Sequence, residues 1–275
     1  MSLVWINGQL VDKSEAKISV FDHGFLYGDG VWEHFRAFNG KLLWPVDGFA
    51  NLLSWIVFER IPIPFTQDEL FAAMERTLRE NDRTDAYIRV IVTRGMGTLG
   101  PDPRKLEPQV VIIAEEYQPY PTELYESGIQ LISQAYDFHR RSLSLIDIVR
   151  LKRIAHDAGC LDAVLLDQDG CLSGCIEGDV FFCTANGTVC QHSQSASFAG
   201  RDGFNQFFQS LGIWTNHGGW KLPDLLQSNE AFIMGTSCGI IGIVQVDGQP
   251  IGTGKEGSIT RRIREAYRKL TRGEL

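Results

Sequence analysis

The chain has 275 residues, of which 44% are hydrophobic and 22% are charged, a composition typical of a folded globular protein. Its formal net charge of −8 argues against nonspecific binding to nucleic acid or to an anionic membrane. No apolar run approaches the length that spans a bilayer, and the first ten residues, MSLVWINGQL, lack the charged and long apolar regions of a secretory signal. We therefore expect a soluble cytoplasmic protein.

Residues 1–117 have the pattern of an antiparallel sheet with helices to one side, which predicts an α+β domain. Asn7-Gly8 and Asn39-Gly40 each separate two short apolar runs, as in two-residue β-hairpins. Thr66 followed by Glu69 predicts a capping box at the start of a helix. The expected helices are 47–60 and 68–81, and the expected longer strands are 86–95 and 109–117.

The stretch 118–127 contains two prolines and is predicted to link this domain to a second one, residues 128–275. Ser258 is expected to cap a basic final helix whose arginines form a solvated face. The Gly-rich stretch 215–223 is expected to be a loop. In this second part the expected strands are 129–135, 162–167, 179–185, 188–191, 230–237 and 240–246, and the expected helices are 147–159 and 201–212.

Five of the six cysteines fall between residues 160 and 190, which raises zinc or a redox pair as an alternative. The spacings contain no CxxC pair, and His192 is the only histidine nearby. Cysteine is also a small and often buried residue. We interpret these cysteines as reduced core or strand residues and predict no metal site.

Four segments occur in an order that resembles a known family: FDHGFLYGDGVWEHFRAFNGKL (21–42), AYIRVIVTRGMGTLGPDPRK (86–105), GCLDAVLLDQDG (159–170) and MGTSCGIIGIVQVDGQPIGTGKEGSITRRIREAY (234–267). Together they are similar to the class-IV aminotransferases, the pyridoxal-phosphate (PLP) fold-type IV group, and most to its branched-chain members. The resemblance covers nearly the whole chain. It implies an N-terminal α/β sandwich, a C-terminal mixed barrel-like domain and a homodimer.

The resemblance also shows departures at the cofactor positions. The family motif I-K-S-L-N-Y-L corresponds here to RRSLSLI, so Arg141 stands where the Schiff-base lysine belongs, and a permanently protonated guanidinium is a very poor amine nucleophile. Gly174 replaces the acid that pairs with the pyridinium nitrogen, with Glu177 expected to face the other way. Leu52 replaces a phosphate-binding arginine, and the phosphate loop is shortened around Gly200. Thr236 and Ser237 keep the phosphate-side hydroxyls.

The positions that line the amino-acid pocket in branched-chain members are better kept. They correspond here to Tyr27, Trp32, Arg36, Tyr87 and Arg89, and period-two spacing places the last two on one strand face. Ligand binding and structural support, in which a buried arginine bonds backbone carbonyls, both remain open for them.

Three functions follow from these observations. The first is a branched-chain-aminotransferase-like pseudoenzyme that binds a small carboxylate or amino acid, with PLP absent or at best held noncovalently; Arg36, Arg89 and Arg141 would then line the cavity. The second is an active PLP-dependent aminotransferase with an unorthodox lysine, for which Lys152 aligns with a second family lysine, although a solvated helix position is the simpler interpretation. The third is a structural or partner-binding dimer.

Overall fold

The computed structural model describes residues 2–104, 106–136, 142–192 and 201–273, with the side chain of Arg201 excepted. Arg141 and Gly200 therefore lie outside the described residues. The chain divides into two compact units. The first unit extends to Tyr117 and takes in residues 142–145, and the second contains the rest. Among the described helices, none combines the length and the apolar composition that crossing a bilayer requires.

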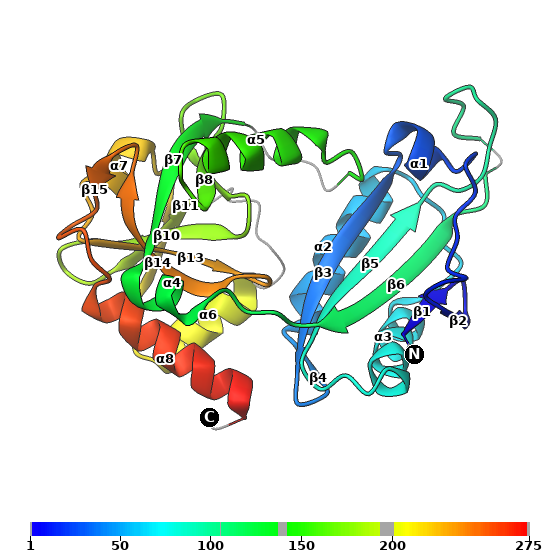
Figure 1. The fold of residues 1–275 in the computed structure, drawn as a ribbon, viewed down its shortest axis with the longest axis horizontal. Coiled ribbons are helices and arrows are strands. Elements are labelled where there is room, and N and C mark those ends of the chain that lie inside the picture. Colours follow the sequence, from blue (N-terminus) through cyan, green and yellow to red (C-terminus); the bar gives the residue numbers. More distant parts are fainter. Residues whose placement is uncertain (1, 105, 137–141, 193–200, 274–275) are drawn as a thin grey trace. The chain divides into compact units, whose positions relative to one another are not determined.

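The first unit contains a six-stranded antiparallel sheet with the strand order β2-β1-β6-β5-β3-β4 (Figure 1). Both predicted hairpins are confirmed, because Asn7-Gly8 and Asn39-Gly40 occupy the turns with positive φ angles (47° and 96°, 49° and 73°). Such angles suit Asn-Gly pairs and match the twist of the flanking strands. The strands are β1 (Leu3–Ile6), β2 (Gln9–Asp12), β3 (Gly30–Phe38), β4 (Lys41–Leu43), β5 (Ala86–Thr93) and β6 (Gln109–Glu116).

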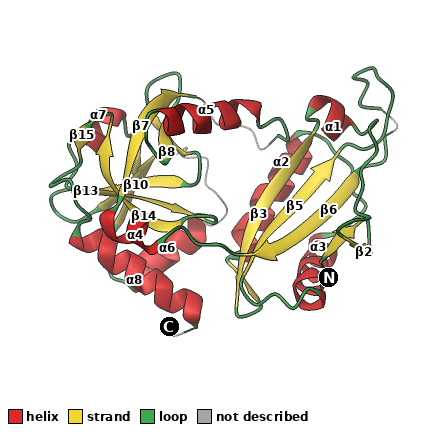
Figure 2. Ribbon diagram, viewed as in Figure 1, coloured by secondary structure: helices red, strands yellow, loops and turns green. Residues whose placement is uncertain are grey.

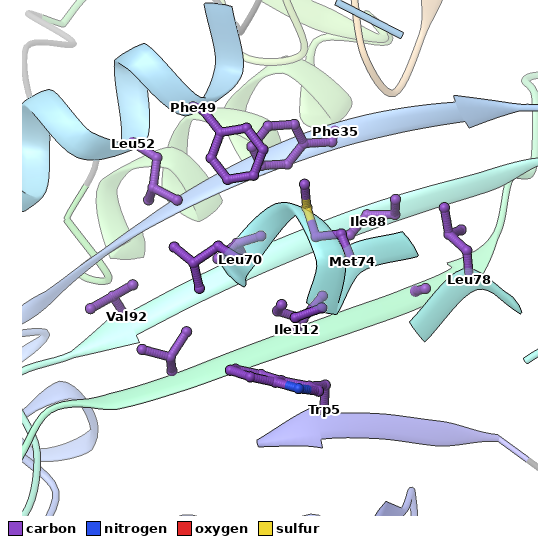
Figure 3. Close-up of a cluster of buried hydrophobic side chains, with 14 of the residues drawn as sticks. Trp5, Phe35, Phe49, Leu52, Leu70, Met74, Leu78, Ile88, Val92 and Ile112 are labelled. Carbon is purple, nitrogen blue, oxygen red and sulfur yellow. The ribbon is translucent and has the colours of Figure 1, made fainter. Parts of the chain in front are cut away.

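Helices α2 (Pro45–Phe58) and α3 (Gln67–Glu80) pack against one face of this sheet and close its core. The predicted capping box at α3 is confirmed, since the Thr66 hydroxyl accepts from the Glu69 amide at 3.3 Å while the Glu69 carboxylate accepts from the Thr66 amide at 2.8 Å. Figure 3 shows the aliphatic and aromatic side chains that the two helices and the strands contribute to this core, among them Leu52, which is fully buried.

The second unit is built on a nine-stranded mixed sheet that curls into a partial barrel (Figure 2), which confirms the barrel-like expectation. The strand order is β12-β11-β10-β13-β14-β7-β8-β9, with β15 on β14. The pairs β7–β8, β7–β14 and β11–β12 are parallel. The strands are β7 (Ile129–Ala135), β8 (Asp162–Leu166), β9 (Leu172–Cys175), β10 (Asp179–Cys183), β11 (Val189–His192), β12 (Thr215–Gly218), β13 (Glu230–Gly235), β14 (Gly239–Val246) and β15 (Gln249–Pro250).

Helices account for several differences from the sequence-based expectations. The stretch 118–127, predicted as a linker, contains helix α4, whose Tyr125 is buried in the core of the second unit. The expected loop at 215–223 is wrong in part, because β12 pairs in parallel with β11 and α7 begins at Leu222. The helices of this unit are α4 (Thr122–Ser127), α5 (Ile146–Asp157), α6 (Arg201–Ser210), α7 (Leu222–Leu226) and α8 (Ser258–Arg272).

The final helix α8 is capped by a residue distant in the sequence. Ser258 makes no side-chain cap, contrary to expectation; instead the Glu230 carboxylate accepts from the amide nitrogens of Ile259 (3.3 Å) and Thr260 (2.9 Å). A negative charge at this helix end also complements the helix dipole. The predicted solvated face is wrong for Arg264, which is buried.

Candidate functional site

In the first unit, one face of the sheet carries the predicted substrate-binding residues. In the register of β3 with β5, His34 lies opposite Arg89 and Arg36 lies opposite Tyr87. Their neighbours along the strands, such as Phe35 and Ile88, point to the helices and the core. Since side chains alternate between the two faces of a strand, the predicted shared face of Tyr87 and Arg89 is confirmed. The face combines aromatic rings with guanidinium groups.

Arg89 lies within an aromatic frame on this face. Its guanidinium carbon is 4.7 Å from the centroid of the Trp32 ring, and its Nη2 atom is 3.5 Å from the Tyr87 hydroxyl. Its Nε atom is buried and has no hydrogen-bond partner among the described residues, and none of their carboxylates pairs with this side chain. A guanidinium with a buried and unused donor is suited to binding an anion.

Arg36 lies on the same face but in a different environment. Its Nη1 atom donates to the carbonyl oxygen of Ala86 at 2.7 Å, and its guanidinium carbon lies 3.3 Å from the centroid of the Tyr117 ring and 4.1 Å from that of Phe38. The residue is buried. These contacts match the structural role, a buried arginine that bonds backbone carbonyls, which the sequence left open for this face.

Tyr27 belongs to α1 (His23–Tyr27), a short helix that precedes β3. Its hydroxyl donates to the carbonyl oxygen of Leu99. Asp22 caps the helix by accepting from the Gly24 amide at 2.7 Å, and it also accepts from the Thr93 hydroxyl at 2.7 Å. The Nε2 atom of the adjacent His23 lies 3.0 Å from the carbonyl oxygen of Thr98, so both residues have structural partners.

The segment that follows Arg141 lies beside β3 in the first unit. The Leu143 amide donates to the carbonyl oxygen of Gly30 at 3.2 Å, and the indole nitrogen of Trp32 donates to the carbonyl oxygen of Ser142 at 3.2 Å. Ser142 also forms an isolated bridge with Val31. Backbone from the RRSLSLI motif thus borders the aromatic face that carries Trp32 and Arg89.

The second unit contains a polar cluster that the sequence did not predict. The Lys152 ammonium is 2.9 Å from one carboxylate oxygen of Glu177, and the Ser237 hydroxyl donates to the other at 2.8 Å. Both charged side chains are about three-quarters buried. The interpretation of Lys152 as a solvated helix residue is therefore wrong. Glu177 lies in the bend between β9 and β10, so the strand alternation expected to turn it away does not apply.

Asp162 interacts with this cluster and is fully buried. Its carboxylate accepts from the amides of Ala163 (2.6 Å), Ile176 (3.1 Å) and Glu177 (3.1 Å). Burial raises the pKa of Asp162 to about 6, the nearby Lys152 ammonium opposes this rise and the Glu177 carboxylate adds to it. Burial also raises the pKa of the Cys238 thiol, with further contributions from Glu177 and Asp162.

The positions that match cofactor contacts can be located only in part. Gly174 lies in β9 with a φ angle of 131°, and it supplies no carboxylate. Thr236 is buried, and the Ser237 hydroxyl is directed to Glu177 as described above. Leu52 lies in the hydrophobic core of the first unit. Arg141 and Gly200 are outside the described residues.

Burial agrees with the interpretation of most cysteines as core residues. All six are free thiols, and four of them, Cys175, Cys183, Cys190 and Cys238, are buried. The partly exposed Cys171 differs, because its sulfur lies near side-chain ligand atoms of Asp167 and His192. The spacing of 21 residues between Cys171 and His192 hides this proximity in the sequence, since neither falls into a short metal-binding motif.

Comparisons with known proteins agree with this architecture. The family model of amino-transferase class IV matches residues 30–246. The putative branched-chain-amino-acid aminotransferase of Methanocaldococcus jannaschii is 34% identical over 281 residues, covering 97% of this chain and 96% of that protein. A D-alanine aminotransferase of Bacillus licheniformis is 28% identical over 276 residues, covering 96% and 95%.

Solved structures give the same result for the fold. The T.th. branched-chain amino acid aminotransferase in complex with 4-methylvaleric acid superposes with a TM-score of 0.90 at 26% identity, covering 100% of this chain and 95% of that one. The same enzyme with pyridoxamine 5′-phosphate gives a TM-score of 0.92, also at 26% identity and with the same coverage. With the family model matching most of its length, the chain belongs to the class-IV aminotransferase family.

Proposed function

We propose that this branched-chain-aminotransferase-like protein binds a small carboxylate and forms no Schiff base with PLP. The observation that carries the proposal is the state of Arg89, whose guanidinium is framed by Trp32 and Tyr87 and has a buried donor without a partner among the described residues. A planar guanidinium fork recognises a carboxylate through paired hydrogen bonds. The ring of Trp32 keeps that fork in place.

We infer the size of the ligand from the side chains near Arg89 and from the ligand of a similar enzyme. Trp32 and His34 are large side chains in contact with one another, with ring centroids 5.3 Å apart, and bulky rings of this kind beside Arg89 favour a compact ligand over a long one. The similar T.th. enzyme has been crystallised with 4-methylvaleric acid. A short branched carboxylic acid of this kind is the ligand class we assign to the site.

Two observations at the positions that match the PLP site support the proposal that no Schiff base forms. Arg141 occupies the sequence position of the Schiff-base lysine. Lys152, the alternative amine, is already bound to Glu177, and the Ser237 hydroxyl, which matches a phosphate contact, donates to that same carboxylate. A phosphate dianion beside Glu177 and Asp162 would meet two acidic groups and a single lysine. This arrangement of the described residues supports the proposal that PLP is not held covalently.

Exposed apolar side chains support a homodimer, which we also propose for this chain. Phe25, Met96 and Leu99 of the first unit are 71%, 60% and 72% exposed, and Val20 is 64% exposed. The segments that carry them are joined by a bridge between Asp22 and Met96. Clustered exposed apolar residues mark interaction surfaces.

Six free thiols fit the reducing environment of the cytoplasm, where we place the protein.

An alternative function is supported by one observation. Lys152 lies in a partly buried polar cluster with Ser237 instead of in solvent. An active PLP-dependent aminotransferase that uses Lys152 as its unorthodox amine would need the Glu177 ion pair to open before the amine could react, because only the unprotonated amine is a nucleophile.

The proposal is tested by calorimetric titration of the protein with 4-methylvalerate. We expect saturable binding by the wild type and at least about a tenfold loss of affinity in Arg89→Gln, because the charged donor to the carboxylate is removed. Arg79→Gln is the matched control, since Arg79 is 69% exposed on helix α3 of the same unit. Equal affinity in the wild type and Arg89→Gln, or no binding by the wild type at all, would refute the assignment.

A further inference from the structure

Three potential metal ligands converge in the second unit, in a place that the proposed carboxylate site does not use. Asp167, Cys171 and His192 each offer one ligand atom, a carboxylate oxygen, a sulfur and an imidazole nitrogen, and these atoms all lie within 4.8 Å of one another. Among the described residues, this is the one group of three or more such side chains that meets this criterion. His192 is buried, and the other two are partly buried.

The turn between β8 and β9 fixes two of the three ligands. One oxygen of the Asp167 carboxylate accepts from the amides of Asp169 (2.9 Å) and Cys171 (2.8 Å), which holds the side chain over the turn. The Asp167 amide in turn donates to the carbonyl oxygen of Cys171 at 2.9 Å. Gly170 adopts a φ angle of 74°, which allows the chain to reverse within five residues. The turn therefore presents carboxylate and thiol together.

The third ligand, His192, lies on a different part of the sheet. His192 is the last residue of β11 and pairs with Gly218 at the end of β12. Cys171 forms an isolated bridge with Lys221, only three residues beyond Gly218. Strand β12 thus pairs with the strand that carries the imidazole, and the short segment after β12 bridges to the residue that carries the thiol. The pairing of β11 with β12 brings a histidine to a turn that is distant in the sequence.

The set of donor atoms indicates which ion would bind. A thiolate and an imidazole suit borderline-soft transition metals, zinc above all, while magnesium and calcium prefer sites made of oxygen alone. Zinc binds sulfur at about 2.3 Å and nitrogen or oxygen at about 2.0–2.2 Å, so tetrahedral ligands lie roughly 3.5 Å apart. The distances among the three ligand atoms, at most 4.8 Å, exceed this separation by about 1 Å, so the side chains need to close by about that much when an ion binds. One thiolate and one carboxylate would neutralise a divalent ion.

We propose that Asp167, Cys171 and His192 form a site for a divalent transition-metal ion, zinc by ligand preference. Three protein ligands leave a fourth position of the tetrahedron for water or a further ligand. The ion ties the β8–β9 turn to the end of β11. The Lys221 ammonium donates a hydrogen bond to the carbonyl oxygen of Asp169 in this turn at 3.0 Å. This hydrogen bond does not involve any of the three ligand atoms.

The test is a metal titration of the full-length protein under reducing conditions after dialysis against a chelator. Wild type is expected to bind one equivalent of Zn²⁺ by calorimetry and to gain a thiolate-to-metal absorption band with Co²⁺. Cys171→Ser is expected to lose that band and at least about tenfold in Zn²⁺ affinity, because a ligand is removed. Cys160→Ser is the matched control, since Cys160 is also a partly exposed free thiol of the second unit.

Three results would overturn the proposal: no stoichiometric Zn²⁺ binding by the wild type, an unchanged affinity in Cys171→Ser, or an equal loss in Cys160→Ser. A second variant, His192→Gln, guards against an effect of the serine on folding. It is expected to retain the circular dichroism of the wild type and to weaken Zn²⁺ binding as strongly as Cys171→Ser. Full affinity in a folded His192→Gln protein would equally refute the site. None of these readouts depends on the binding of 4-methylvalerate.

Discussion

Replacing the buried Asp162 by asparagine should change how the stability of the protein depends on pH. Burial raises the pKa of this carboxyl group from 3.8 to about 6, a difference of about two units. Each unit corresponds to about 1.4 kcal/mol, so ionising Asp162 in the folded protein costs about 3 kcal/mol more than in the unfolded chain.

The direction in which stability changes with pH follows from proton binding by Asp162. Between pH 4 and 6 the folded state holds a proton that the unfolded state has released, so stability is greatest below the unfolded pKa of 3.8 and is lost as pH rises through the folded value of about 6. The free energy of unfolding of wild type minus that of Asp162→Asn should therefore fall by about 2 kcal/mol from pH 4 to pH 7, since part of the total is already lost at pH 4. The loss of hydrogen bonds in the variant shifts this difference by a constant and leaves its slope intact.

The measurement is urea unfolding of both proteins at pH 4, 5, 6 and 7. Val164→Ala serves as the control, because it removes buried methyl groups from the same strand β8 and destabilises the unit without removing a titrating group. Its difference from wild type should be the same at every pH. A difference between wild type and Asp162→Asn that stays constant over this range would refute the reasoning.

Three further predictions concern the first unit and the cofactor position. Thr66→Ala removes the capping box with Glu69 and should lower the free energy of unfolding by about 1 kcal/mol, measured by urea unfolding. Arg94→Met leaves the partly buried Asp29 without its partner at 2.6 Å and should cost about 3 kcal/mol in the same assay; a loss below about 1 kcal/mol would contradict it. Arg141→Lys alone should give no transaminase activity with PLP and branched-chain amino acids, because the family resemblance implies that other cofactor contacts are lost as well; robust turnover would contradict it.

Local signals in the sequence were sufficient for much of the secondary structure. The Asn-Gly turns and the capping box at Thr66 depend on residues within a few positions of one another, and the structure confirms each of them. The cap of α8 depends on Glu230, some 28 residues before Ser258, and no local pattern predicts such a partner. The strand at 215–218 carries no alternation of apolar residues and is defined by its pairing with β11.

The candidate sites likewise combine features that local sequence patterns predict with features that depend on contacts between distant residues. Period-two spacing was enough to place Tyr87 and Arg89 on one face. It does not distinguish Arg36 from Arg89, because the difference lies in their neighbours. Arg36 contacts a backbone carbonyl and the Tyr117 ring, whereas Arg89 has a buried Nε donor without a hydrogen-bond partner among the residues that the structure describes. The pair of Lys152 with Glu177 joins α5 to a bend 25 residues later, which only the folded chain brings together.

The central claim about this protein is that it forms no Schiff base with PLP. The direct measurement is the intact mass of the protein after incubation with PLP and reduction with borohydride, followed by peptide mapping. We predict no stoichiometric phosphopyridoxyl adduct, because the family resemblance implies that Arg141 takes the lysine position and because Lys152 is paired with Glu177. One equivalent of adduct on a single lysine would contradict this claim and establish the PLP-dependent alternative. If peptide mapping places the adduct on Lys152, it should be lost in Lys152→Met.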